Sequence, residues 1–412
     1  MAAPGRMYAA RMLVVLLSEL LGQPEASSFL RGVLAGGRFA NAYLFQGPAG
    51  VGKGTAGLAF ARALLCGRAA GADAAGPGLF DAAETAPAAA TLDDACGQCG
   101  SCAKSAGLQH PDLRFLFPVS GEEKELDDTI AETLAAWRED PFYVFAYEKA
   151  ASIRLSLTRD LLRELAFKPF EAGRRVVVVR DADRMREDQY SALLKSIEEP
   201  GASTVWILTT SRPSRLPATI RSRCQRVRFL ALSESTIGGF LERRAGVSAR
   251  DARMLAALSG GSLARALALR DAQPLELRNQ ALALVEPALR GDSAGLWKAV
   301  QAFNRFGRAG RETLRRLLEF QELWLRDLLR ARYGAPRESL VNRDREAEIR
   351  RQAERTDATE IRRRLMVLEE ALRAIEGNVT ADLALFSAMT RVAEPRFREA
   401  RWPRHATGRW DY

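Results

Sequence analysis

The sequence lacks an apolar run long enough to cross a lipid bilayer. The longest candidate, from Met12 to Leu21, contains Ser18 and Glu19 and has about half the length of a membrane span. No small-residue cleavage site of the secretory type follows it promptly. We therefore expect this segment to form an amphipathic helix in a cytoplasmic protein that has no membrane partner.

Histidine and cysteine are scarce, with two and five residues among 412. Cys96, Cys99 and Cys102 have the spacing CxxCxxC, and an odd number of cysteines with such a cluster favours a metal site in a reducing compartment over disulfides. Together with Cys66 they provide four thiolates, which suit tetrahedral Zn²⁺. The alternative is a set of unrelated buried cysteines. His110 is a weaker candidate for a further ligand.

An excess of acidic residues is also absent, because 61 Lys and Arg outnumber 51 Asp and Glu and give a net charge of +10. This balance fits a protein associated with nucleic acid. The alternative explanation is a GC-rich genome that favours arginine. The hydrophobic share of 47% and the charged share of 27% are those of an ordinary globular protein.

Short β-branched runs alternate with helical runs in the first half of the chain, which predicts an α/β domain with a parallel sheet. The expected strands are 42–46, 113–117, 175–180 and 204–210, and the expected helices are 53–66 and 187–199. After Phe229 the strand patterns stop. The chain beyond is expected to be helical, and two apolar stripes predict the core of a helical bundle. The stripes consist of Leu314, Leu317, Leu318, Trp324, Leu325 and Leu328, and of Ile361, Leu365, Leu368, Leu372 and Ile375.

A glycine-rich loop follows the first strand and opens the first helix, which is the context that a phosphate-binding loop requires. Its expected nucleotide-binding residues are Gly47, Gly50, Gly52, Lys53, Gly54 and Thr55. The glycines allow backbone N–H groups to surround phosphate oxygens, and Lys53 adds a positive charge. Gly54 stands where the usual pattern has the Ser or Thr that binds Mg²⁺. Thr55 comes one place later, in an order that resembles adenylate kinases.

The acidic residues that follow the strand at 175–180 are incomplete for ATP hydrolysis. A hydrolytic site needs an Asp to hold Mg²⁺ and an adjacent carboxylate to polarise water. Asp181 can serve as the first, but Ala182 stands at the second position. Asp183 is better interpreted as a turn residue or a helix cap. We therefore expect negligible turnover by the isolated chain.

Several motifs occur together in an order that resembles bacterial DNA polymerase III clamp-loader subunits. They are the strand with its phosphate loop, the four cysteines, VVVVRDADRM (176–185), LLKSIEEP (193–200), TVWILTT (204–210), SRC (222–224) and SGGSLARAL (259–267). The resemblance is strong over residues 18–275. It is weaker at NVTADLALFSAM (378–389), which is similar to the end of the family's collar domain.

The resemblance implies an AAA+ P-loop domain over 1–229 with a zinc module at about 66–102, a helical lid over 230–275 and a helical collar over 276–412. It implies that Arg223 is an arginine finger that acts on a neighbour's ATP. It also implies that Asp181, Thr210 (or Thr209) and Arg265 contact nucleotide. The implied cofactors are Zn²⁺ and ATP or ADP. The implied partners are gamma/tau and delta subunits in a hetero-pentameric ring, together with the sliding clamp and primed DNA.

The motifs leave three functions to be distinguished. Gly54 and Ala182 favour the delta-prime type, which keeps SRC and the zinc site but has a degraded ATP site. The alternative is a gamma/tau-type motor, which would need the missing carboxylate at position 182. A nucleotide kinase would explain the order GKGT but neither the cysteines nor the SRC motif.

Overall fold

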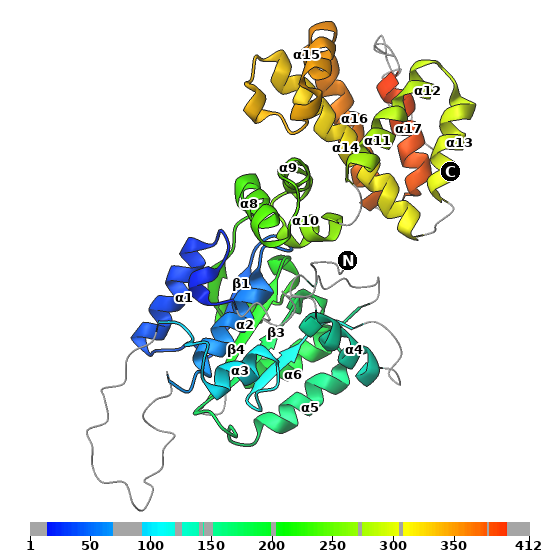
Figure 1. The fold of residues 1–412 in the computed structure, drawn as a ribbon. Helices are drawn as coiled ribbons and strands as arrows, with labels where there is room; N and C mark the ends of the chain where they lie inside the picture. The colour runs from blue at the N-terminus through cyan, green and yellow to red at the C-terminus, as the bar shows by residue number, and fades with distance from the viewer. Residues whose placement is uncertain are drawn as a thin grey trace, which may run out of the picture. The chain divides into compact units, whose positions relative to one another are not determined.

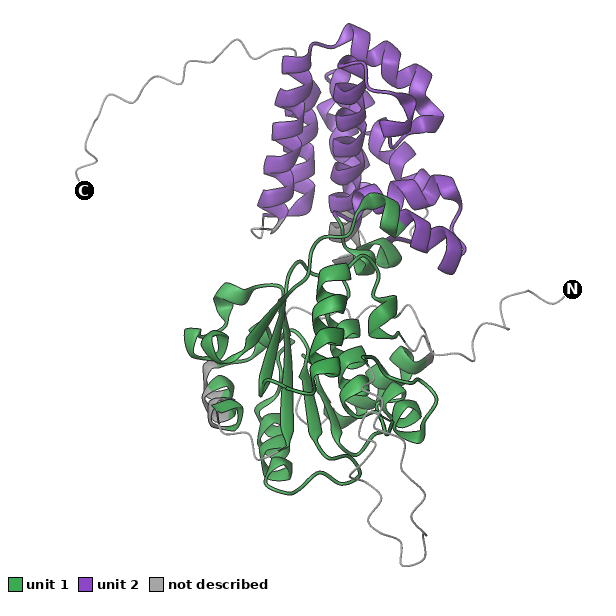
Figure 2. Cartoon of the chain, turned by 90° about the vertical axis from the view of Figure 1, so that its left-hand side faces the viewer, with its two compact units in different colours: residues 1–237, 261–268 green, residues 238–260, 269–412 purple. Residues whose placement is uncertain are grey.

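The structure is a computed structural model that describes residues 15–68, 93–119, 126–139, 143, 151–198, 203–270, 274–304, 308–376 and 379–393. The chain forms two compact units, which are coloured separately in Figure 2. Unit 1 lies within residues 1–237 and 261–268, and unit 2 within 238–260 and 269–412. The division at 229 and 275 into three domains stays a prediction.

Unit 1 is built on a five-stranded sheet in which every pairing is parallel (Figure 1). The strand order is β2-β3-β4-β1-β5. The strands are β1 (Ala42–Gln46), β2 (Leu113–Leu116), β3 (Arg175–Val179), β4 (Thr204–Thr210) and β5 (Gln225–Arg228). Because the strands are parallel, their carboxyl ends meet at one edge, where ligands bind in open α/β sheets.

Helices cover both faces of this sheet, which explains why the central strands are continuous apolar runs. Alternate residues of β3 enter different cores: Val176 and Val178 face one, while Val177 and Val179 face the other. The helices of unit 1 are η1 (Leu17–Glu19), α1 (Pro24–Gly36), α2 (Lys53–Leu64), α3 (Gly100–Ala106), α4 (Leu126–Glu139), α5 (Leu155–Leu165), η3 (Ala182–Arg184), α6 (Glu187–Glu198), η4 (Pro213–Arg215) and α7 (Ala218–Arg223). Helices α1, α2 and α3 belong to the first core and α5, α6 and α7 to the second.

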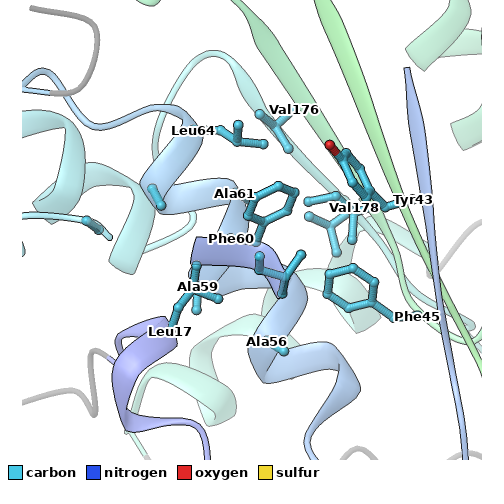
Figure 3. Packing of buried hydrophobic residues seen from close by; sticks show 14 of the residues in the cluster. Leu17, Tyr43, Phe45, Ala56, Ala59, Phe60, Ala61, Leu64, Val176 and Val178 are labelled. Atoms are coloured by element: carbon cyan, nitrogen blue, oxygen red, sulfur yellow. The ribbon is translucent and has the colours of Figure 1, made fainter. Parts of the chain in front are cut away.

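Helix α2 is fixed against the sheet by aromatic packing. The ring of Phe60 meets that of Tyr43 edge to face, with centroids 5.1 Å apart, and lies 6.4 Å from that of Phe45. Figure 3 shows this group between α2 and the strands, with Val176 and Val178 beside it. Removing a buried phenylalanine of this kind costs about 3–5 kcal/mol. The packing therefore fixes the orientation of the helix whose first turn carries Lys53.

The sequence-based elements are largely confirmed, with four differences. The expected helix at 12–21 is wrong over its described part, where residues 15–21 contain only the short turn η1. Helix α2 ends at Leu64, before Cys66. Strand β5 was not expected, since only Val227 of its residues is buried. The segment 219–224, in which no element was predicted, lies mostly on α7.

Every regular element among the described residues of unit 2 is a helix, and one predicted stripe is confirmed as core throughout, the other in three of its five residues. In α14 (Arg308–Arg332) all the predicted stripe residues are buried, whereas in α16 (Ala358–Glu376) Leu365 and Leu372 are only partly buried. The remaining helices of the described residues, of which α8 and α10 begin in unit 1, are α8 (Glu234–Arg244), α9 (Ala249–Leu258), α10 (Leu263–Arg270), α11 (Pro274–Ala283), α12 (Val285–Leu289), α13 (Ser293–Asn304), α14, η5 (Arg337–Ser339), η6 (Arg343–Arg345), α15 (Glu346–Arg355), α16 and α17 (Ala381–Ala393). In the part of the chain that the structure describes, no helix has the length and hydrophobicity of a membrane span.

Candidate functional site

The phosphate loop joins the carboxyl end of β1 to the first turn of α2. Two of its glycines are required by positive φ angles and by close approaches of other residues. Gly47 has φ +153°, and a Cβ there would lie 2.2 Å from the carbonyl oxygen of Phe229. Gly50 has φ +73°, and a Cβ there would lie 2.1 Å from Ser262 Oγ. The amide of Ala264 donates to the Gly50 carbonyl at 3.2 Å, so the amino end of α10 packs directly on the loop.

Lys53 closes the loop on itself. Its Nζ donates to the carbonyl oxygens of Gly47 at 2.9 Å and Pro48 at 2.5 Å, and only 5% of the residue is exposed. Burial lowers the pKa of this amine to about 8, while Asp181 raises it and Arg180 lowers it further. Lys53 is therefore a buried cation whose charge an incoming phosphate would stabilise.

The first turn of α2 has no hydroxyl that could hold Mg²⁺ beside Lys53. A Cβ added to Gly54 would lie 2.5 Å from Nη1 of Arg180, so the guanidinium fills the space in which a serine or threonine side chain would begin. Thr55, the neighbouring hydroxyl, is exposed. Successive residues of a helix point about 100° apart, so Thr55 does not replace the missing group.

The acidic turn after β3 is tied to the end of β4. Asp181 has the left-handed φ of +48°, and its amide donates to Thr209 Oγ1 at 3.0 Å. This turn leaves Ala182 only 1% exposed, within the second core. Asp183 accepts a hydrogen bond from the Thr210 hydroxyl at 2.7 Å. The position that needs a catalytic carboxylate therefore holds a buried methyl group, and Asp183 has the structural contact expected of a turn residue.

The four cysteines predicted as zinc ligands come together. Their Sγ atoms all lie within 4.8 Å of one another, and the pairs Cys66–Cys99 and Cys96–Cys102 are each 3.9 Å apart. Four sulfurs about 2.3 Å from a Zn²⁺ ion would be ~3.8 Å apart in a regular tetrahedron. The cluster fits a metal such as zinc, and none of its cysteines is in a disulfide. His110 is outside it and accepts a bond from the Asp112 amide at 3.1 Å.

Amide donors in this cluster point at the sulfurs of Cys66 and Cys99. Burial raises the pKa of the Cys99 thiol, but hydrogen bonds from the amides of Cys102 and Gly67 and from the side chains of Cys102 and Cys96 together hold it below its ordinary value. The pKa of Cys102 is instead raised, by its hydrogen bond with Cys66 and by burial. The Cys96 amide donates to Cys66 Sγ at 3.5 Å. Zinc ligands bind as thiolates, so these amides favour the metal-binding form.

Arg223 ends α7 with its side chain 41% exposed. Its Nε forms an ion pair with Glu198 Oε1 at 2.8 Å, and its Nη1 donates to the Thr219 carbonyl at 3.0 Å. Arg223 is thus on the surface of unit 1, and a helix and an acidic partner orient it. Arg265 lies on α10, the helix that packs on Gly50, and its amide donates to Ser262 Oγ at 3.3 Å.

Three side chains that position these groups were missed by the sequence analysis. They are Arg180 beside Gly54, Glu198 beside Arg223 and the buried Asp112. Asp112 accepts hydrogen bonds from the amides of Phe170, Glu171 and Ala172 at 2.5–2.8 Å and so fixes the loop before β3. The Arg180 side chain could have been suspected because it directly precedes Asp181, whereas nothing in the sequence relates Glu198 to Arg223.

Comparison with known proteins finds similarity to subunits of DNA polymerase III. Residues 81–233 match the family described as DNA polymerase III, delta subunit. The chain is 32% identical over 258 residues to DNA polymerase III subunit delta' of Pseudomonas aeruginosa, which covers 62% of this chain and 64% of that protein. It is 27% identical over 234 residues to subunit delta' of Bacillus subtilis, covering 57% of this chain and 55% of the relative.

The motor-type subunits are also similar, at lower identity. Subunit tau of Bacillus subtilis is 24% identical over 258 residues, which cover 61% of this chain and 37% of tau. The matched stretch therefore spans less than two thirds of the length of each of these relatives. The parallel sheet, the P-loop and the all-helical carboxyl-terminal region fit an AAA+ architecture. Together with the family match and the delta' relatives, they make the chain similar to delta-prime-type subunits of DNA polymerase III.

Proposed function

We propose that the chain is the delta-prime-type subunit of a clamp loader, which assists ATP-dependent loading of a sliding clamp onto primed DNA. In this proposal Arg223 acts as an arginine finger on the ATP of an adjacent subunit, and the chain has little or no ATPase activity of its own. Gamma/tau-type and delta-type subunits would complete a hetero-pentameric ring. The helical lid over 230–275 and the collar over 276–412 are part of the proposal.

One observation carries this proposal: the chain lacks the carboxylate needed for ATP hydrolysis but keeps an exposed arginine that could reach a neighbour's ATP. The position of the water-polarising carboxylate holds the buried Ala182, whereas Arg223 remains 41% exposed at the end of α7. An arginine acts in trans when a partner supplies it to another subunit's nucleotide, where it stabilises the charge of the transition state. A chain that can offer an arginine to a neighbour's nucleotide, but lacks the carboxylate needed to hydrolyse ATP itself, suits an activating subunit.

Zinc and nucleotide belong to the proposal as cofactors. Cys66, Cys96, Cys99 and Cys102 would hold one Zn²⁺, which would join the chain just after α2 to the start of α3. Lys53 and the amides of the glycine loop would hold phosphates, with Thr210 and Arg265 in the positions of nucleotide sensors. No step of hydrolysis is assigned to this site.

Reconstitution tests the proposal. The purified chain should show negligible ATP turnover. Added to motor and delta-type subunits, it should raise DNA-stimulated ATPase activity and clamp loading above those of the mixture that lacks it. A mixture whose loading is the same with and without the chain would contradict the assignment.

The second candidate is a gamma/tau-type motor, which Gly52 and Lys53 favour because the phosphate loop retains them. A motor would hydrolyse ATP at its own loop. Steady turnover by the isolated chain that disappears in Lys53→Ala would therefore support the motor and exclude the first proposal.

A further inference from the structure

The residues around Lys53 do not fit a magnesium ion. In phosphate loops of this class, Mg²⁺ is held by the Ser or Thr that follows the lysine and by the Asp that follows the neighbouring strand. The first group is missing here, because position 54 is glycine and Thr55 is exposed. Any hydroxyl at position 54 would have to share its space with Arg180.

Arg180 fills this place from the end of β3. Its Nη1 lies 2.5 Å and its Cζ 3.5 Å from the ideal Cβ position of Gly54. The Arg180 amide donates to the Leu116 carbonyl at 2.8 Å, which continues the pairing of β3 with β2. The start of this side chain is therefore fixed at the carboxyl edge of the sheet, and its cationic end lies beside the first turn of α2.

The remaining acidic groups are already engaged. Asp181 forms an ion pair with Arg180, with Oδ2 3.5 Å from Nε. Asp183 accepts the hydrogen bond of Thr210. A divalent cation at this place would meet a guanidinium, and the carboxylate that should hold the metal is paired with that same guanidinium.

We infer that Arg180 takes the place of Mg²⁺, so that the loop accepts the phosphates of a nucleoside di- or triphosphate in metal-free form and excludes the divalent cation. A guanidinium is suited to this role because its planar fork of N–H donors matches phosphate oxygens and it stays charged at every physiological pH. Gly54 is the matching change, since only a residue without Cβ leaves room for the guanidinium. The inference depends on the proposed nucleotide site but not on the ring or on Arg223.

The first test measures ADP binding to the full wild-type chain by isothermal titration calorimetry, in excess EDTA and in excess MgCl₂. We expect binding in EDTA, and Mg²⁺ should leave the affinity within about twofold or weaken it, whereas a metal-dependent site gains tenfold or more, about 1.4 kcal/mol. Electron paramagnetic resonance with Mn²⁺ and ADP should show no protein-dependent signal beyond that of free Mn²⁺–ADP.

Variants locate the effect at Arg180. Arg180→Ala should weaken ADP binding in EDTA by about tenfold or more, because it removes a charge-assisted contact. The exposed Arg226 of β5 supplies the matched control, and Arg226→Ala should leave binding unchanged. In the double variant Gly54→Ser with Arg180→Ala, a hydroxyl and an unpaired Asp181 are both available, so Mg²⁺ should now strengthen binding.

Three results would overturn the inference: strengthening of wild-type binding by Mg²⁺ of about tenfold or more, a protein-dependent Mn²⁺ signal, or no ADP binding in EDTA. The wild-type measurements decide without any variant, so a folding defect in Arg180→Ala leaves them valid. Each of these results is compatible with clamp loading that depends on Arg223. Failure of this inference and failure of the proposed function can therefore be told apart.

Discussion

The loop around Lys53 and the helix that carries Arg223 lie in the same unit but retain different parts of ATP chemistry. The loop keeps its glycines and lysine, but Gly54 and the buried Ala182 replace the groups that hold metal and polarise water. Helix α7 presents an oriented, exposed guanidinium. Lys53 also has contacts that need no nucleotide, because it bonds to Gly47 and Pro48. The retained glycines and lysine of the loop are therefore weaker evidence for hydrolysis than the residues around them.

The largest effect should come from removing Arg223, the proposed arginine finger. Arg223→Ala should lower turnover at the adjacent site by about 10³–10⁵-fold, and the total for a ring with several active sites by less. Arg223→Lys should recover little, since lysine lacks the planar fork. The measurement is DNA-stimulated ATPase activity and clamp loading in reconstituted rings, with the exposed Arg226→Ala as control. Unchanged activity in rings that assemble normally would make Arg223 an ordinary surface charge.

Zinc binding by the four cysteines should depend neither on the loop around Lys53 nor on Arg223. Wild-type protein should contain about one zinc per chain, and Cys99→Ser should lose the metal and more than about 2 kcal/mol of unfolding free energy. Cys224→Ser is the control, because Cys224 is buried away from the cluster and this variant should keep its zinc. Metal analysis and chemical denaturation decide the matter. A metal-free wild type with full stability would contradict the zinc assignment.

Restoring one carboxylate should not restore hydrolysis in the loop region. Ala182 is 1% exposed, so Ala182→Glu would bury an acid, at a cost of about 1–3 kcal/mol or more, and would leave Arg180 in the metal position. We expect lower stability and still negligible ATP turnover by the isolated variant. Robust turnover would show that the missing carboxylate is the sole defect of the loop region. That region would then, like α7, retain a working part of the ATP chemistry.

The pH dependence of nucleotide affinity tests the charge state of Lys53. Its pKa of about 8 lies below the ordinary 10.5, and a bound phosphate favours the cation and raises the pKa. ADP affinity should therefore fall as pH rises above about 8, by at most about tenfold per pH unit. The effect of Lys53 on stability runs in the opposite direction. Because the unfolded chain binds more protons than the folded chain between pH 8 and 10.5, the free energy of unfolding should rise with pH over this range. Titrations of wild type and Lys53→Met would separate this group from others, and an affinity that stays flat to pH 10 would count against it.

The smallest effect should come from the partner of Arg223. Glu198 and Arg223 are both 41% exposed on their side chains, and such pairs contribute about 0–1 kcal/mol. Glu198→Gln should change stability by no more than that and leave activation of the neighbour intact. A large loss of ring ATPase activity would instead make Glu198 a positioning residue, on which the orientation of the Arg223 side chain depends.

The sequence by itself determined much about this protein. The β-branched runs at 175–179 and 204–210 specify buried parallel strands, the glycines and Lys53 specify a loop between strand and helix, and the apolar stripes specify the helical core of unit 2. These are local patterns, set by the periodicity of side chains along one element. The absence of a carboxylate at Ala182 could be read in the same way.

Only the tertiary structure decided which distant residues meet. It brings Cys66 to the CxxCxxC segment, the Arg180 guanidinium to Gly54 and Glu198 to Arg223, and it turns Ala182 into the core. None of these contacts is a matter of spacing along one helix or strand, because each joins elements that chain topology places side by side. The physical reason is that a side chain's partners depend on strand order and helix packing, which residues far apart in the sequence establish together.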